Sequence, residues 1–224
     1  MCSERKLCAE FPVRRSSKSG LGSYCKNCHR RLNRAFKMKL WAALGGPSCA
    51  RCSESGLDFL TLEHKNGGGK LHRMEASSWR SIYKEIIRDM ESRSLYEVLC
   101  MNCNAAKSFE TLERSRSGTK KSILHHGQRV RLKAEALRIV HGSQSPTCTC
   151  CGHGVVAELC LDHVIPYSQD PVGPRGFKMY GWVVEYPDDA KAHLQVLCFN
   201  CNQSKGVGLS CAHQRPDSPL IPLH

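Results

Sequence analysis

A nearly identical cysteine motif occurs twice in the chain, and it constrains the fold more than any other feature. Residues 98–108 read VLCMNCNAAKS, and residues 196–206 read VLCFNCNQSKG. In each copy two cysteines stand three positions apart, an asparagine follows the second cysteine at once, and a lysine follows three positions later. Two cysteines at this spacing form half of a four-cysteine zinc site. We therefore expect each motif to need a second cysteine pair elsewhere in the chain.

The motif is the end of a longer internal repeat. Eight polar positions match, the first four at a separation of 99 residues and the last four at 98. The matched pairs are Cys49/Cys148, Cys52/Cys151, Glu63/Asp162, His64/His163, Cys100/Cys198, Cys103/Cys201, Asn104/Asn202 and Lys107/Lys205. Because the matched positions stay aligned across a gap of only one residue, the chain contains two copies of one module. The register also selects Cys151 rather than Cys150 as the partner of Cys148.

The cysteines favour metal over disulfides. There are fifteen, an odd number, and many stand in CxxC pairs without a signal peptide ahead of them. A closed site of four thiolates leaves no open position, so we expect structural zinc that stabilises small modules. Reactive thiols are the alternative, which the repeated spacing disfavours. The expected ligand sets are Cys49, Cys52, Cys100 and Cys103 for one zinc, and Cys148, Cys151, Cys198 and Cys201 for another.

The N-terminal region contains a further half-site. Cys25 and Cys28 have the CxxC spacing, and Cys2 and Cys8 are the candidates to complete a third zinc site. The spacing between Cys2 and Cys8 is wide for a zinc knuckle. The alternative is an incomplete site in which Cys8 is an ordinary buried thiol.

Three cysteines remain outside these sets. Cys160 lies in a predicted strand and is expected to be a core thiol. The sequence assigns no role to Cys150 or Cys211.

The net charge indicates a polyanionic partner. The formal charge is +13, and each zinc on four thiolates lowers it by two, so three such sites would still leave +7. No apolar run has the length of a membrane span, and the N-terminus is polar. We therefore expect an intracellular, reducing location, cytoplasmic or nucleoid-associated, and not a secreted protein.

Each copy predicts the same order of elements. A helical stretch precedes the first cysteine pair, at 34–46 and 131–143, and a strand follows it, at 57–64 and 157–163. A second strand then leads into the repeated motif, which opens a helix. Copy one also inserts an amphipathic helix near 77–90, whose apolar stripe is expected to pack in the core. The stripe consists of Trp79, Ile82, Tyr83, Ile86, Ile87 and Met90.

The expected fold class is therefore small α+β modules stabilised by zinc. The boundaries follow from the repeat and from a basic, serine-rich stretch between the copies. They are a ribbon-like segment at 1–35, module one at 36–110, a linker at 111–127, module two at 128–212 and a tail at 213–224.

The repeated residues that are not cysteines indicate chemistry. The carboxylates of Glu63 and Asp162, each with the amide oxygen of Asn104 or Asn202, are suitable ligands for Mg²⁺. Neutral imidazole can accept a proton from water near pH 7, as His64 or His163 would. Together these groups fit one-metal hydrolysis of a phosphodiester. A lone acid–histidine pair is more often a surface pair, but this pair recurs in register.

These motifs resemble the HNH nuclease family, which has the ββα-metal fold. The resemblance rests on Cys-x2-Cys, then Asp/Glu-His, then Leu-Cys-x2-Cys-Asn-x2-Lys, and it covers most of the chain. Residues 11–31 are similar to a zinc ribbon found before HNH modules in phage nucleases. The resemblance implies DNA cleavage that leaves 5′-phosphate and 3′-hydroxyl ends. It matches His64 and His163 to the general base.

The resemblance also implies the ligands of the catalytic ion, which would be Mg²⁺ or Mn²⁺. It matches Glu63, Asp162, Asn104 and Asn202 to those ligands.

Three departures from the family pattern favour copy two as the active one. Copy one has Glu63 where the family usually has aspartate. Leu95 and His193 stand where many members have a loop-bracing asparagine, and the first ribbon cysteine is missing.

The function expected from the resemblance is a double-strand DNA endonuclease of homing or restriction type, of the kind found in phages and mobile elements. Two modules in one chain would act as an intramolecular pseudo-dimer, so a monomer is favoured and a homodimer is possible. The alternatives are a junction resolvase like endonuclease VII and a non-catalytic zinc protein that binds DNA.

Basic side chains near the ribbon, the linker and the motifs are candidates for phosphate contacts, although any one of them can be solvated surface. They are Arg14, Arg15, Lys18, Arg30, Arg31, Lys107, Lys120, Lys121 and Lys205.

Overall fold

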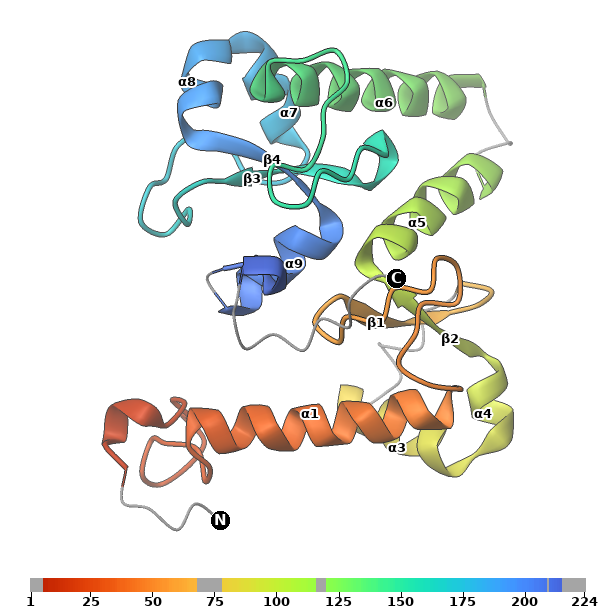
Figure 1. Ribbon diagram of the computed structural model, residues 1–224, viewed down its shortest axis with the longest axis vertical. Helices are drawn as coiled ribbons and strands as arrows, with labels where there is room; N and C mark the ends of the chain where they lie inside the picture. Colours follow the sequence, from red (N-terminus) through yellow and green to blue (C-terminus); the bar gives the residue numbers. More distant parts are fainter. Residues whose placement is uncertain (1–5, 68–77, 116–119, 209, 215–224) are drawn as a thin grey trace. The chain divides into compact units, whose positions relative to one another are not determined.

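The computed structural model describes residues 6–67, 78–115, 120–208 and 210–214; the side chains of 109–126, 207 and 208 lie outside that description. Figure 1 shows the elements in chain order. The helices are α1 (Lys26–Ala43), α3 (Trp79–Arg88), α4 (Met90–Ser94), α5 (Met101–Ser115), α6 (Lys120–His141), α7 (Lys178–Glu185), α8 (Pro187–His193) and α9 (Phe199–Gly208). The strands are β1 (Leu60–His64), β2 (Tyr96–Cys100), β3 (Leu159–His163) and β4 (Leu194–Cys198). Short 3-10 turns are η1 (Cys8–Glu10), η2 (Val156–Glu158) and η3 (Ala212–Gln214).

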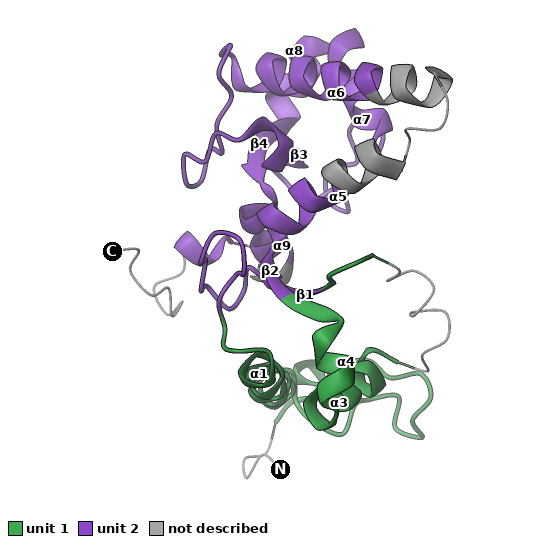
Figure 2. Cartoon of the chain, turned by 90° about the vertical axis from the view of Figure 1, so that its right-hand side faces the viewer, with its two compact units in different colours: residues 1–47, 64–97 green, residues 48–63, 98–224 purple. Residues whose placement is uncertain are grey.

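The chain forms two compact units, which Figure 2 distinguishes by colour. Unit 1 contains residues 1–47 and 64–97, and unit 2 contains residues 48–63 and 98–224. The division passes through β1 and β2, so it does not follow the expected boundaries at 36–110 and 128–212. Most of the expected linker at 111–127 is helical, because α5 reaches Ser115 and α6 begins at Lys120.

Two small sheets give the chain its α+β character. β3 pairs antiparallel with β4, with Asp162 opposite Gln195. β1 and β2 form the other sheet. Main-chain bonds from Lys65 to Leu95 and from Met101 to Phe59, both 2.9 Å, flank that sheet and show that it is also antiparallel.

The core of unit 2 lies between the second sheet and three helices. Figures 1 and 2 both show α6, α7 and α8 side by side, and these helices contact one another. Leu137 of α6, Leu159 of β3, Val183 of α7 and Val196 of β4 are fully buried. The strand residues therefore form a continuous apolar layer beneath the helices.

The core of unit 1 lies between α1 and α3. Leu40 and Trp41 of α1 and Ile82 and Ile86 of α3 are buried, which confirms the predicted helices. Both ends of the predicted stripe are wrong, because Trp79 is 49% and Met90 78% exposed.

Met90 lies beyond a helix boundary that the apolar spacing does not reveal. α3 ends at Arg88, and the Asp89 carboxylate caps a new helix by accepting the Ser92 N–H at 2.6 Å. Among the described residues, none of the helices combines the length and the apolar character that crossing a membrane requires.

Candidate metal centres and acid–histidine sites

The first predicted cysteine set comes together in unit 2. Cys49 and Cys52 lie in a turn, Cys100 ends β2, and Cys103 lies in the first turn of α5. Their four sulfurs lie within 4.8 Å of one another, with 3.7 Å between Cys52 and Cys100. Zinc bound tetrahedrally to sulfur at about 2.3 Å requires sulfur–sulfur separations of about 3.8 Å. This tetrad, which we call tetrad one, could therefore hold zinc, as the spacing predicts.

The second set, tetrad two, has the same construction. Cys148, Cys151, Cys198 and Cys201 also lie within 4.8 Å of one another, with 3.8 Å between the sulfurs of Cys151 and Cys198. In tetrad one the N–H of Cys103 donates to the Cys100 sulfur at 3.4 Å. In tetrad two the N–H of Cys201 donates to the Cys198 sulfur at the same distance. The predicted pairing of Cys148 with Cys151 is confirmed.

Close packing of the sulfurs perturbs their acidity. Burial raises the pKa of the Cys100 thiol to about 12. In tetrad two a hydrogen bond from Cys151 lowers the pKa of Cys148, while hydrogen bonds with Cys148 raise the pKa of Cys198 and Cys201. Four thiolates at this separation repel one another, so full ionisation needs a cation at the centre.

The N-terminal cysteines form only part of a site in the described residues. Cys25 is buried at the start of α1, and its sulfur accepts the N–H of Cys28 at 3.4 Å, the bond that both tetrads also contain. Cys8 is exposed in η1, so the interpretation of Cys8 as a buried thiol is wrong. Cys2 lies outside the described residues, and the third zinc set stays a prediction.

In copy two the histidine of the acid–histidine pair is held in one orientation. His163 ends β3, is 8% exposed, and its Nε2 lies 2.9 Å from the main-chain oxygen of Val172. A carbonyl can only accept, so Nε2 carries the proton and Nδ1 carries the free lone pair. The edge of the ring meets Tyr167 at a centroid distance of 5.1 Å. This bond fixes the ring, and Nδ1 is the nitrogen that remains to accept a proton from water when the imidazole is neutral.

The neighbouring acid is bonded to a cation from α9. Lys205 Nζ donates to Asp162 Oδ2 at 2.6 Å and to the main-chain oxygen of His163 at 2.6 Å. Gln195, opposite in β4, donates to the same carboxylate oxygen at 3.2 Å. Lys205 thus neutralises the predicted metal ligand, and its expected contact with DNA stays a prediction.

Asn202 lies on the same face of β3 as Asp162. Its Nδ2 donates to the Cys160 sulfur at 3.3 Å, and Cys160 is two residues before Asp162. Alternate residues of a strand share a face. The structure thus brings Asp162, Asn202 and Lys205 to one face, while His163 lies on the other. Cys160 is 5% exposed, which confirms it as a core thiol.

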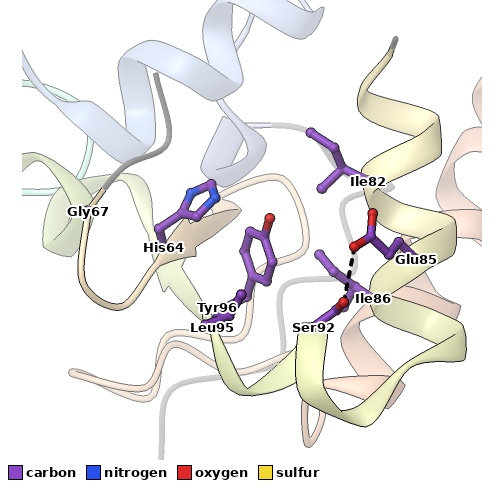
Figure 3. A pocket seen from close by; sticks show the side chains of 8 residues that line it. All are labelled: His64, Gly67, Ile82, Glu85, Ile86, Ser92, Leu95 and Tyr96. Atoms are coloured by element: carbon purple, nitrogen blue, oxygen red, sulfur yellow. Dashed lines mark hydrogen bonds between the residues drawn. The ribbon is translucent and has the colours of Figure 1, made fainter. Parts of the chain in front are cut away.

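In copy one the histidine lines a cavity within unit 1. Figure 3 shows His64 beside Tyr96, facing Ile82 and Ile86 of α3. The cavity measures about 210 Å³, and the His64 and Tyr96 rings have a centroid distance of 4.4 Å. The division between the units falls directly before His64, which places Glu63, Asn104 and Lys107 in unit 2. A joint site of these residues stays a prediction.

The candidate DNA contacts are distributed over both units. Arg14, Arg15, Lys18, Arg30 and Arg31 are exposed in unit 1, as phosphate contacts require. Lys107 is partly buried in α5. The side chains of Lys120 and Lys121 lie outside the described part of the chain.

One pair of residues that links the copies was not predicted. The Asn102 N–H donates to Oδ1 of Asn200 at 3.0 Å, and the Asn200 N–H donates to Oδ1 of Asn102 at 2.9 Å. Each asparagine side chain thus caps the first turn of the helix that starts within the other motif. Such reciprocity is the mark of a two-fold contact. The available signal was an identical asparagine between the cysteines of both motifs.

A further group of possible ligands was also missed. Cys150, Cys201, Cys211 and His213 place their ligand atoms within 4.8 Å of one another. The only sequence signal was that Cys150 and Cys211 remained without a role.

Comparisons of the chain with protein-family models, with characterised proteins and with solved structures found no match. A functional assignment therefore depends on the motif residues and the geometry described above.

Proposed function

We propose that the chain is a metal-dependent DNA endonuclease with two HNH-type modules in tandem. The observation that carries this proposal is the arrangement at the end of β3. There His163, held in one orientation by Val172, follows Asp162, and Asn202 lies on the same face of the strand as Asp162. A base on one side of a strand and oxygen ligands on the other fit phosphodiester hydrolysis with one metal ion.

Each residue of copy two has a part in this chemistry. Asp162 and Asn202 would hold Mg²⁺ or Mn²⁺ through a carboxylate and an amide oxygen. The ion supplies positive charge to the scissile phosphate and the leaving oxygen. His163 accepts the proton of the attacking water at Nδ1 while its Nε2–H stays bonded to Val172. The hydrogen bond to the Val172 carbonyl prevents rotation of the ring. Nδ1 is therefore oriented to accept a proton before substrate binds.

The Lys205 ammonium supports a cation-binding role for this face. It lies 2.6 Å from both a carboxylate oxygen and a carbonyl oxygen, so the site already favours positive charge. Asp162 Oδ1 takes no part in the bonds of Lys205 or Gln195 and is the oxygen that a divalent ion would use. Both oxygens of the carboxylate would then be bonded to cations.

The reciprocal contact of Asn102 and Asn200 supports a pseudo-dimer. It joins the two motifs within unit 2 by the same bond in both directions. Under this proposal each copy cleaves one strand, and one chain makes a double-strand break.

The test is cleavage of supercoiled plasmid by the full chain with Mg²⁺ or Mn²⁺. The wild type should give linear product, and His64→Ala and His163→Ala should each give nicked circles only. His29→Ala, which changes an exposed histidine of α1, serves as the control and should cleave as the wild type does. Absence of cleavage with either ion would contradict the proposal.

A non-catalytic zinc protein that binds DNA is the second candidate. The observation that favours it is the bond between Lys205 and Asp162, because an acid already neutralised needs no metal ion. This candidate predicts DNA binding without cleavage, and the same binding for His163→Ala. Gel-shift and plasmid assays on one preparation separate the two functions.

A further inference from the structure

A second set of metal-binding groups lies against tetrad two. Nδ1 of His213 is 3.5 Å from the Cys201 sulfur and 3.2 Å from the Cys211 sulfur, and Cys150 completes the group. Sulfur and imidazole nitrogen on one tetrahedral zinc lie about 3.5 Å apart, given bond lengths of about 2.3 and 2.0 Å. The spacing is therefore that of a zinc site whose ligand atoms already converge.

Cys201 belongs to both sets. Its sulfur is a member of tetrad two and of the group with Cys150, Cys211 and His213. Together the sets contain seven ligands, which is the number that two tetrahedral ions need when they share one. We propose that copy two holds a two-zinc centre in which the Cys201 thiolate bridges the ions.

The extra ligands are held in place by the fold. Ala212, between Cys211 and His213, donates its N–H to the Ser204 hydroxyl at 2.8 Å, and both Ala212 and Ser204 are buried. The His213 ring stacks on Phe59 at a centroid distance of 4.9 Å. Cys211 is 4% exposed and Cys201 fully buried. These contacts fix η3 against α9, so the site does not have to be assembled by the ion.

The charge of the group also fits two ions. Six thiolates and one neutral imidazole around two Zn²⁺ have a net charge of −2, the same as one zinc in a four-cysteine site. With one zinc in tetrad two, Cys150 and Cys211 would either stay protonated or add two uncompensated negative charges. Thiolate and imidazole ligands together favour zinc over hard cations.

Among the described residues, copy one shows no equivalent of this second set. Arg51 occupies the position that matches Cys150. Helix α5 continues to Ser115, whereas α9 ends at Gly208 and the chain reaches η3 four residues later. Under this proposal copy one would hold a single zinc and copy two a pair.

The second ion would also stabilise the surroundings of Asp162. Cys150 and Cys211 line a cavity of about 340 Å³ together with Gln195 and Lys205. Those two residues are the ones that bond the Asp162 carboxylate. Zinc at the second position would therefore fix one wall of the cavity beside this acid.

The first test is the zinc content of the full chain, purified in reductant without chelator and measured by plasma mass spectrometry. Cys150→Ser and Cys211→Ser should each contain one zinc fewer than the wild type. Cys160→Ser removes a buried thiol outside every cluster and should contain the same amount. Because the measurement is a difference, metal bound elsewhere in the chain cancels. Equal zinc in the wild type and in Cys211→Ser would overturn the proposal.

The second test detects the bridge itself, first in the wild-type chain and then in Cys211→Ser. After exchange of zinc for cadmium-113, two ions that share one thiolate should give resonances split by their mutual coupling. Cys211→Ser should remove one resonance and the splitting of the other. A spectrum in which no pair of cadmium resonances shows coupling would exclude a bridging Cys201.

Discussion

Copy one and copy two share a frame and differ in what surrounds it. Both contain two strands, a following helix and four cysteines with matching sulfur separations. In copy two Asp162 faces Gln195 and bonds Lys205, whereas the position matching Gln195 in copy one is Glu97. His163 bonds a carbonyl, and His64 lines an apolar cavity. A backbone that zinc on four cysteines can hold would tolerate this divergence in the neighbouring side chains.

The largest effect should come from breaking the shared frame. Cys100→Ser and Cys198→Ser each remove one thiolate at the end of a second strand, so both should release zinc. Structural zinc contributes about 10–16 kcal/mol in small modules, and we expect each variant to lose most of its cooperative unfolding transition. Zinc content and circular dichroism melts measure this. An unchanged melt for Cys100→Ser beside a collapsed Cys198→Ser would show that only copy two depends on its tetrad.

The next effect concerns the chemistry and rests on the proposed endonuclease. His163→Ala should lower the rate of the strand cut by copy two by about 10²–10⁴, the usual contribution of a general base. Glu63→Asp should raise the rate of the other cut by about tenfold or more, because the shorter acid matches Asp162. Rates of nicking and of linearisation, measured separately on plasmid, check both.

The opposite result for Glu63→Asp would also distinguish the two copies. If Glu63→Asp slows linearisation, copy one is already adapted to glutamate. Asp162→Glu is then the matched variant, and it should slow copy two alone.

A smaller effect tests the reciprocity between Asn102 and Asn200. Each side chain satisfies a buried N–H of the other motif, so Asn102→Ala and Asn200→Ala should each lower the free energy of unfolding by about 1–2 kcal/mol. Denaturant unfolding of the zinc-loaded chain measures this, with the exposed Asn33→Ala as a neutral control. If the two variants differ in free energy of unfolding by more than about 1 kcal/mol, the two halves of the contact do not contribute equally to stability.

The smallest effect compares one backbone position in the two cysteine turns. Ser53 has a φ of 62°, and its match Gly152 has 77°. Left-handed backbone costs a residue with a Cβ about 1–2 kcal/mol, partly offset by the greater freedom of glycine when unfolded. Ser53→Gly should therefore stabilise the chain by about 0.5 kcal/mol. Gly152→Ser should destabilise the chain by a similar amount. No atom lies within 4 Å of the added Cβ, so the backbone conformation is the source of the cost.

The sequence could predict the features that depend on regular spacing along the chain. The cysteine spacing predicted both tetrads, the helical stretches at 34–46 and 131–143 lie within or beside α1 and α6, and the apolar periodicity predicted the buried positions of α3. These are local patterns, and a period fixes which side chains share a face.

What the sequence could not predict were contacts made when distant segments fold together. The bond between Lys205 of α9 and Asp162 of β3 is one such contact. His213 was assigned to a tail beginning directly after module two, although the fold places it against Cys201. No spacing rule connects Cys150 with residues about sixty positions later, so only the packing of η3 on α9 could reveal the group.

The reciprocal asparagine contact has a consequence for how such a chain can change. In a dimer of identical subunits every substitution enters both halves of a two-fold contact at once, so neither half can be altered alone. Here the halves are separate segments of one polypeptide, and the contact needs no second molecule, whatever the concentration. One half can therefore carry Cys150, Cys211 and His213 while the other carries Arg51 and a continuous helix.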